Sequence, residues 1–414
     1  MRIRDWLQTV RHIEVSSVSA WHAVDPTLSK TAERVEIALT KKNVLTDVGK
    51  IIVIGAGAAG LTAGHLLEQR GIEFEILEAA PIYGGRVRKL EGFADFPIDL
   101  GAEWIHRWIS AKPTAFAALL NGSDIQFGTV QDKPRTVSTW NGKQLRRRNW
   151  IRLLPLPIDL KFTDATWFDA IERLVTPNLI ERLHLNTAVA AVEYTSEMVV
   201  VTTDSGEQHV ADRVLVTIPI TMLQREAIRF EPSLPDYKQA EIHKEQMPGG
   251  LKVFIKFSKR FYPDLLMMGS PFRGGALNEC IYYNAAFGKN STCNVLGFFA
   301  QGAKAERYTT HSTDKDLFDF VRAELDEIFD GQASKYYIDH AIQDWTREPN
   351  IWGSYSQRKA SGKTLAEPVG GKVFFAGEAM NANGKTIAVH GACESAYSAV
   401  EKMLTQPSGD YLHP

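Results

Sequence analysis

The chain has 414 residues, of which 44% are hydrophobic and 23% are charged. This composition is typical of a globular protein with a core large enough for two domains, and it excludes collagen-like, disordered and coiled-coil chains. The formal net charge of -2 offers no positive field that would hold nucleic acid or an anionic membrane. We therefore expect a small molecule as the partner, and no nucleic acid.

The cysteines Cys280, Cys293 and Cys393 are too few and too scattered for a disulfide framework or a zinc site, so we expect a reducing compartment and no bound metal. The first residues lack the unbroken apolar run of a secretory signal, and no stretch approaches the roughly 18 apolar residues of a membrane span. These features predict a cytoplasmic protein without a membrane span. Residues 1–48 are expected to form an N-terminal extension, and the sequence indicates no oligomeric state.

A strand, a helix and a second strand are predicted directly after this extension. Residues 51–54 are an apolar run bounded by glycine, as in a strand of a parallel sheet that is buried on both faces. Residues 58–70 carry apolar side chains at helical spacing and stop at Gly71, and residues 73–78 are a second strand that ends on an acid. The pattern indicates a βαβ unit.

The turn between the first strand and the helix has the spacing GxGxxG. Gly55 suits a tight turn, Gly57 lets the backbone approach a pyrophosphate, and Gly60 lets the helix pack closely against the strand. Free N–H groups at the start of the helix favour an anion there. Glu78 is placed to accept hydrogen bonds from a ribose and disfavours a 2′-phosphate, so NADP is disfavoured while NAD and FAD remain.

The middle of the chain has a different pattern. Residues 188–223 alternate, are rich in β-branched side chains and contain an Asp-Ser-Gly turn, which predicts a short antiparallel meander. Residues 251–257 alternate as a strand with one buried face, and residues 314–329 have helical periodicity. There is no internal repeat, so the predicted fold class is α/β, with a second domain built on a mixed sheet.

The stretch "LEAAPIYGGRVRKL", which begins at Leu77, resembles the matching segment of the flavin-containing amine oxidases, a family that includes monoamine oxidases, polyamine oxidases and the lysine-specific histone demethylases. Further segments follow in the order of the family, from Lys50 to about Met403. Those that carry the resemblance are "LEAAPIYGGRVRKL", "PIDLGAEWIHR", "HLNTAVAAVEY", "DRVLVTIPITMLQ", "IRFEPSLP", "GGLKVFIKFSKRFYP", "WGSYS" and "VFFAGEAMNANGKTIAVHGA". The second of them is most similar to polyamine oxidases, and together they favour FAD over NAD.

The resemblance implies a discontinuous, Rossmann-like FAD-binding domain with an inserted substrate-binding domain made of a mixed sheet and helices. FAD is long, so the first βαβ unit would hold its adenosine and pyrophosphate, while a strand near residue 373 and the following helix would hold the rest. The FAD domain is expected at residues 49–110, 185–235 and 370–405, and the substrate domain at residues 111–184 and 236–369.

By the same resemblance, Glu78 binds the adenosine ribose, the backbone at Val189 meets adenine, and Glu378 contacts the ribityl-pyrophosphate side. The complete set of expected cofactor-binding residues is Gly55, Gly57, Ala59, Gly60, Glu78, Gly85, Arg86, Glu103, Trp104, Val189, Trp345, Gly377, Glu378, Ala388 and Val389. Trp352 is a further aromatic candidate for the flavin side, with plain core packing as the alternative. The FAD is expected to be non-covalent, because Ser354 stands where monoamine oxidases have the cysteine that forms the thioether.

Lys252 is the residue that would distinguish an oxidase from a protein that only binds flavin. A lysine between apolar neighbours is costly to bury unless a polar group receives it. The alternation alone leaves open whether Lys252 faces the core or the solvent, as Lys256 is expected to do. The resemblance implies that Lys252 holds a water against flavin N5.

The reaction implied is hydride transfer from the carbon beside an uncharged amine to flavin N5, followed by hydrolysis of the imine and reoxidation of the flavin by O2 to hydrogen peroxide. Tyr355 matches one wall of the aromatic cage that surrounds the substrate nitrogen in the family. Ala388 stands where the other wall commonly has tyrosine, so the cage is half open. Glu103 would attract a cationic amine and His106 would take its proton. Lys252, Tyr355, His106 and Glu103 are therefore the candidate catalytic residues.

The favoured substrate is a polyamine or another primary or secondary amine. Arg107 could pair with a carboxylate, which keeps an L-amino acid oxidase open as an alternative. A second alternative is an FAD-dependent desaturase or porphyrinogen-type oxidase with the same fold. A flavoprotein without catalysis is the alternative from a different class.

Overall fold

The structure is a computed structural model of the chain, and it describes residues 48–106, 128–148, 159–195, 197–269, 280–382 and 387–405. Most of the expected N-terminal extension and Arg107 lie outside the described residues. Within the described ranges, no helix combines the length and the apolarity needed to cross a bilayer.

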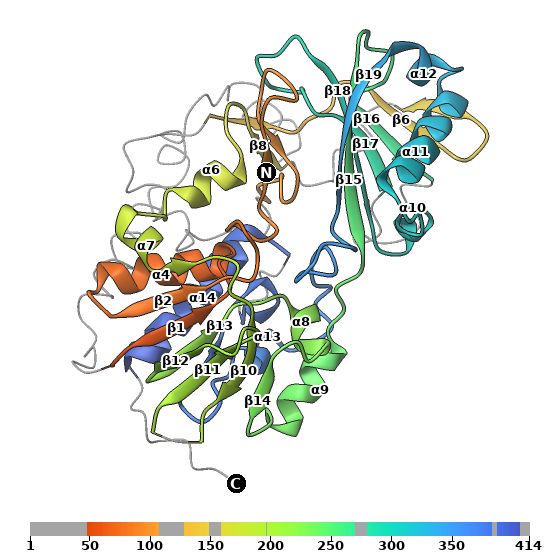
Figure 1. Ribbon diagram of the computed structural model, residues 1–414. Coiled ribbons are helices and arrows are strands. Elements are labelled where there is room, and N and C mark those ends of the chain that lie inside the picture. Colours follow the sequence, from red (N-terminus) through yellow and green to blue (C-terminus); the bar gives the residue numbers. More distant parts are fainter. Residues whose placement is uncertain are drawn as a thin grey trace, which may run out of the picture.

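The nucleotide-binding part is built on a five-stranded parallel sheet with the order β20-β13-β1-β2-β9. Its strands are β1 (Ile51–Ile54), β2 (Phe74–Leu77), β9 (Leu183–His184), β13 (Arg213–Val216) and β20 (Val373–Phe375). Helices α4 (Ala58–Gln69) and α14 (Val389–Thr405) pack together against one face of this sheet (Figure 1). The expected βαβ unit and the final strand and helix are thereby confirmed.

A four-stranded sheet with the order β12-β11-β10-β14 covers the other face. Its strands are β10 (Val189–Glu193), β11 (Val199–Thr203), β12 (Gln208–Ala211) and β14 (Arg229–Glu231). The first three form the expected antiparallel meander. The prediction that the meander continues to residue 223 is wrong, because β13 is buried along its whole length and joins the parallel sheet instead.

The second part contains a seven-stranded mixed sheet with the order β19-β15-β18-β17-β16-β6-β7. Its strands are β6 (Val137–Trp140), β7 (Leu145–Arg148), β15 (Gly250–Phe257), β16 (Leu265–Met268), β17 (Cys280–Asn284), β18 (Asn294–Gln301) and β19 (Tyr337–Asp344). Helix α11 (Asp314–Ile328) lies on its outer face (Figure 1) and confirms the helix expected there. The shorter helices α10 (Glu306–Thr309) and α12 (Gln332–Tyr336) flank it.

Strand β15 is buried on both faces, which corrects the prediction of one buried face. Leu251, Val253 and Ile255 pack under α11, and Phe254 packs on the opposite side against Phe93 and its neighbours. Because side chains alternate along a strand, Lys252 lies on the face that Phe254 occupies, away from α11.

The remaining described elements are short. They are β3 (Lys89–Leu90), β4 (Ile98–Asp99), β5 (Thr129–Gln131), β8 (Leu160–Phe162), α6 (Trp167–Glu172), α7 (Pro177–Glu181), α8 (Ile220–Gln224), α9 (Asp236–Lys244), α13 (Gly362–Leu365) and the 3-10 turns at Gly302–Lys304 and Glu378–Met380. The sequence places α6 and α7 in the substrate domain, yet Trp167, Ile171 and Leu179 belong to the apolar cluster of β1 and α4. Their packing therefore joins these helices to the nucleotide-binding part.

Candidate active site

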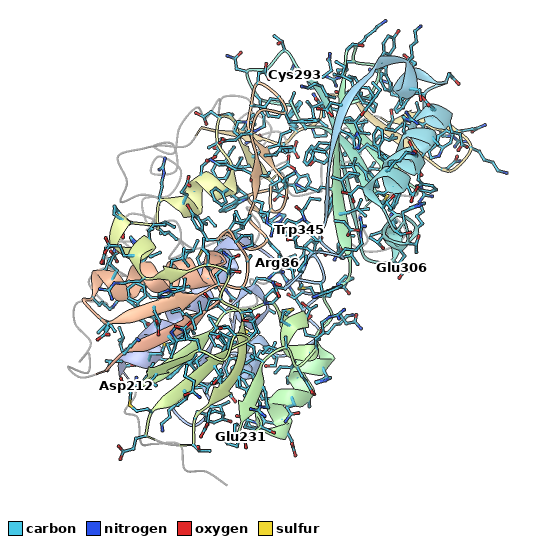
Figure 2. The ribbon with its side chains drawn as sticks, viewed as in Figure 1. Arg86, Asp212, Glu231, Cys293, Glu306 and Trp345 are labelled. Carbon is cyan, nitrogen blue, oxygen red and sulfur yellow. The ribbon has the colours of Figure 1, made fainter. Side chains whose placement is uncertain are left out.

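A cavity of about 1310 Å³ lies where the two parts meet. Typical sites for drug-sized molecules occupy about 300–1,000 Å³, so this cavity has room for a large cofactor and a substrate. It is lined by all the expected cofactor-binding and catalytic residues except Gly60. Figure 2 shows Arg86 and Trp345, both on the cavity wall, at the junction between the two parts.

The glycine-rich turn fits a dinucleotide. A Cβ on Gly57 would meet nothing within 4 Å, because this residue borders the cavity, and the N-terminus of α4 has no side-chain cap. Its free N–H groups and its dipole therefore favour a pyrophosphate. Gly60 acts differently: a Cβ there would lie 1.9 Å from the carbonyl oxygen of Gly55, so only glycine allows the helix to approach the turn.

Glu78 is held firmly at the end of β2. Its Oε2 accepts the backbone N–H of Ala56 at 2.6 Å, and its Oε1 accepts that of Ala80 at 2.8 Å. Burial raises the pKa of this carboxyl, and the two N–H groups oppose that rise. Each oxygen keeps a further lone pair, so the carboxylate is preorganised to accept hydrogen bonds from a ribose.

Glu378 connects segments that are far apart in the chain. Its carboxylate lies 3.0 Å from the guanidinium of Arg86, which also donates to the carbonyl oxygen of Ser354 at 2.8 Å. The hydroxyl of Ser356 donates to Glu378 at 2.6 Å, and the N–H of Ile387 donates to it at 3.1 Å. Glu378 therefore holds these segments of the cavity wall together. Its expected contact with the ribityl-pyrophosphate side of FAD stays a prediction.

The cavity wall near the start of α14 has small side chains, and another part of the wall is aromatic. Ala388 and Val389 border the cavity at the N-terminus of this helix. Trp345 is buried, and its indole N–H donates to the carbonyl oxygen of Leu100 at 3.1 Å. The expectation that Trp352 lines the flavin side is wrong: its side chain is exposed, lies outside the cavity and stacks under the guanidinium of Arg225 at 4.3 Å.

Lys252 lies at the cavity wall and is only 2% exposed. Its Nζ donates to Oε2 of Glu103 at 2.7 Å and to the carbonyl oxygen of Asp99 at 3.1 Å. Burial lowers the pKa of Lys252, and the negative charge of Glu103 opposes that shift. The reading of Lys252 as a solvent-facing residue is therefore excluded.

Glu103 has further partners that sequence reasoning missed. Nζ of Lys161, also 2% exposed, lies 2.7 Å from Oε1 of Glu103, and the hydroxyl of Tyr283 donates to Oε2. Burial alone would raise the pKa of Glu103, but the ammonium groups of Lys161 and Lys252 outweigh it and hold the pKa well below its usual range. Both oxygens already have lysine partners, and the expectation that Glu103 attracts the substrate amine stays a prediction.

A signal for Lys161 is present in the sequence. Like Lys252, this lysine stands between two apolar residues of a short strand, here Leu160 and Phe162. A lysine in that place is costly unless a carboxylate receives it. The partner itself could not be read from the sequence, because β4, β8 and β15 meet only in the folded chain.

His106 and Asp159 form a second polar pair on the cavity wall. Nδ1 of His106 lies 2.9 Å from Oδ2 of Asp159, and among the described residues no donor reaches the other oxygen of Asp159. Trp104, next in the wall, donates its indole N–H to Asp132 at 2.6 Å. Asp159 therefore adds a carboxylate to the cavity wall. Tyr355 also borders the cavity, as expected.

In the described ranges, no group of three or more His, Cys, Asp and Glu side chains could hold a metal ion. Ser354, at the position where the thioether would form, donates its hydroxyl to the carbonyl oxygen of Pro248 at 2.9 Å. Cys393 on α14 is fully buried and does not border the cavity.

The chain matches known protein families over most of its length. Residues 169–404 match the profile of the flavin containing amine oxidoreductases, and residues 53–120 match an NAD(P)-binding Rossmann-like domain. Polyamine oxidase 4 of Oryza sativa subsp. japonica is 29% identical, with 85% of this chain and 88% of that protein covered. Lysine-specific histone demethylase 2 of Homo sapiens is 25% identical over 80% of this chain, which spans 50% of the demethylase.

Solved structures share the fold. Putrescine oxidase, in its wild-type form bound to putrescine, has a TM-score of 0.69 at 15% identity and covers 86% of this chain and 99% of its own. Cyclohexylamine oxidase from Brevibacterium oxydans IH-35A has a TM-score of 0.68 at 16% identity, and the match covers 86% of this chain and 98% of that chain. The family profile spans more than half of the chain, so this protein belongs to the flavin-containing amine oxidoreductases and its cofactor is FAD.

Proposed function

We propose that this protein oxidises a primary or secondary amine or a polyamine, with O2 as the electron acceptor and hydrogen peroxide as a product. The observation that carries the choice of an amine is Asp159, a carboxylate that borders the cavity and lies 2.9 Å from Nδ1 of His106. The negative charge of a carboxylate on the cavity wall attracts a cationic group of the substrate.

FAD supplies the chemistry of the oxidation, because it accepts the hydride from the carbon next to the nitrogen. The residues of the chain prepare the substrate for this step. Asp159 fixes the ring of His106, and the two side chains together border the cavity. Tyr355 and Trp104 narrow the cavity and exclude water from it.

The test uses the FAD-loaded protein and a panel of monoamines, diamines, polyamines and L-amino acids. We expect amines to bleach the flavin absorbance without oxygen and to yield peroxide in air. Bleaching by L-amino acids alone would make the protein an L-amino acid oxidase. No bleaching by any member of the panel would contradict amine oxidation and leave a desaturase, or a flavoprotein without catalysis, as the function.

The role of Asp159 is tested separately. Asp159→Asn removes the negative charge but keeps the size, so KM for the preferred amine should rise about tenfold or more. Asp164→Asn, at an exposed position on the same stretch of chain, is the matched control and should leave KM unchanged. Equal KM values for the two variants would show that Asp159 does not bind the substrate.

A further inference from the structure

Two lysines share one carboxylate at the wall of the active site. Nζ of Lys161 and Nζ of Lys252 each lie 2.7 Å from a different oxygen of Glu103, and both side chains are almost fully buried. Lys252 borders the large cavity, whereas Lys161 lies behind Glu103 and does not. The two ammonium groups therefore have the same partner but different access to the substrate.

One carboxylate can balance only one ammonium group. An uncompensated charge in a buried site is expensive, so one of the two lysines gives up its proton more easily than the other. Both Nζ atoms lie over aromatic rings, that of Lys161 4.7 Å from the centre of the Tyr283 ring and that of Lys252 5.1 Å from the Trp104 ring. Lys161 is the better stabilised cation because it is also attracted by Asp132. Lys252, in contrast, donates to Oε2 of Glu103, and the hydroxyl of Tyr283 donates to the same oxygen.

We propose that Lys161 is the permanent counter-ion of Glu103, and that this neutral pair leaves Lys252 free to take up and release a proton at the cavity wall. Lys161 and Glu103 are positioning residues in this arrangement, since they act through Lys252. The inference rests on the proposed amine oxidation, because the proton that Lys252 takes up comes from the substrate ammonium.

The proton transfer involves no change of oxidation state. An N–H bond of the substrate ammonium breaks, its electron pair stays on the substrate nitrogen, and a new N–H bond forms on Nζ of Lys252. The substrate is then the uncharged amine from which hydride can leave. The proton returns to water after the product has left the cavity.

The surroundings of Lys252 agree with this assignment. Burial lowers the pKa of Lys252, whereas Glu103 outweighs burial at Lys161 and raises its pKa. Burial, helped by Glu103, raises the pKa of Asp99 well above its usual range. The titratable and polar groups around Lys252 within the described part of the chain are Asp99 on β4, Glu103 after it, Lys161 on β8, Tyr283 on β17 and Gln343 on β19. Lys289, after β17, interacts with Glu103 and Lys161.

Charge changes at Glu103 and Lys161 should shift the titration of Lys252 in opposite directions. Lys161→Met leaves Glu103 unbalanced, so the pH profile of anaerobic flavin reduction by an amine should move upward by about 1–3 pH units. Glu103→Gln should move it downward. The double variant removes a neutral pair and should restore the profile to within about half a unit of the wild type.

Arginine at position 161 keeps the charge, so Lys161→Arg should keep the profile of the wild type. Lys256→Met, on the same strand and the same face as Lys252, is the control that should change nothing. If Lys161→Met does not fold, Glu103→Gln and the double variant still test the proposal. A pH profile of the double variant that does not return toward that of the wild type would contradict the neutral pair.

A second readout does not depend on turnover. In protein labelled with 15N at lysine Nζ, the signal that is lost in Lys252→Met belongs to Lys252, and its titration should show the same shifts in the variants. An unchanged titration in Lys161→Met would overturn the inference. If no amine is oxidised but the NMR shifts appear, the proposed function fails while the counter-ion role of Lys161 stands.

Discussion

The guanidinium of Arg86 lies 3.0 Å from the carboxylate of Glu378, although 292 residues separate them in the chain. Arg86 follows β2 and Glu378 follows β20, and both strands belong to one parallel sheet. The carboxyl ends of parallel strands meet at one edge of the sheet, which is where ligands bind in open α/β folds. The ion pair thus joins the segments that follow the second and the last strands of this sheet, at the cavity wall.

Glu378→Ala should weaken both the fold and FAD binding. The change leaves Arg86, the hydroxyl of Ser356 and the N–H of Ile387 without their acceptor, and breaking a buried pair costs about 3–5 kcal/mol. Urea unfolding of the apoprotein measures this loss. Glu181→Ala, at an exposed position of α7, should stay within about 0.5 kcal/mol of the wild type, and a loss of the same size there would contradict the prediction.

Glu78→Lys should yield a protein that loses its flavin on desalting. The substitution removes the acceptor for the ribose hydroxyls and places a cation there, which should weaken binding about 10²-fold or more. Absorbance of the desalted protein, before and after incubation with FAD, measures the effect. Glu73→Lys, at the exposed residue just before β2, is the matched control. A colourless Glu73→Lys or a yellow Glu78→Lys would contradict this role.

Lys252→Met should keep FAD but lower the rate of flavin reduction by amines about 10²-fold or more. Methionine keeps the length of the side chain and removes the ammonium at the cavity wall. Rapid mixing without oxygen measures the rate, and Lys256→Met serves as the control. A wild-type rate in Lys252→Met would mean that the buried ammonium is only structural.

FAD should leave the protein when it is denatured with acid and passed through a filter. A thioether needs a thiolate, and Ser354 has only a hydroxyl, which already donates to Pro248. Burial raises the pKa of Cys393 to about 12, so that thiol is not ionised at neutral pH. The yellow colour is therefore expected in the filtrate, and colour in the precipitate would reveal a covalent bond.

Lys238 should make stability depend on pH. Its Nζ donates to carbonyl oxygens at the end of α13, and burial lowers its pKa from 10.5 to about 7. Between these values the unfolded chain keeps a proton that the folded chain has lost, so the free energy of unfolding rises with pH, by up to about 1.4 kcal/mol per unit.

The measurement compares the wild type with Lys238→Met by chemical unfolding across this pH range. The gain with rising pH should vanish in Lys238→Met and persist in Lys244→Met, since Lys244 lies on the same helix with an exposed side chain. Parallel curves for the wild type and Lys238→Met would show that Lys238 does not titrate in this window.

Local pattern was sufficient for the glycine-rich turn and for the βαβ unit, whereas most of the other expected residues of the cavity wall came from the family resemblance. It failed where the outcome depends on which elements meet. The alternation around β13 fits a meander as well as a parallel strand, and only burial on both faces decides. Lys161 and Asp159 were missed for the same reason, because each acquires its partner from a distant segment. Trp352 is an aromatic residue of the kind expected near a flavin, but its side chain is exposed to solvent.

The packing of α14 on α4 also dictates when during synthesis the FAD site can form. Ribosomes make the chain from the N-terminus, so the βαβ unit emerges long before the helix that begins at Val389. Until then, the apolar side of α4 that later receives Cys393, Ala396 and Val400 has nothing to cover it. Cofactor capture is therefore a late event, and the nascent chain passes through an interval in which this surface can aggregate or recruit chaperones.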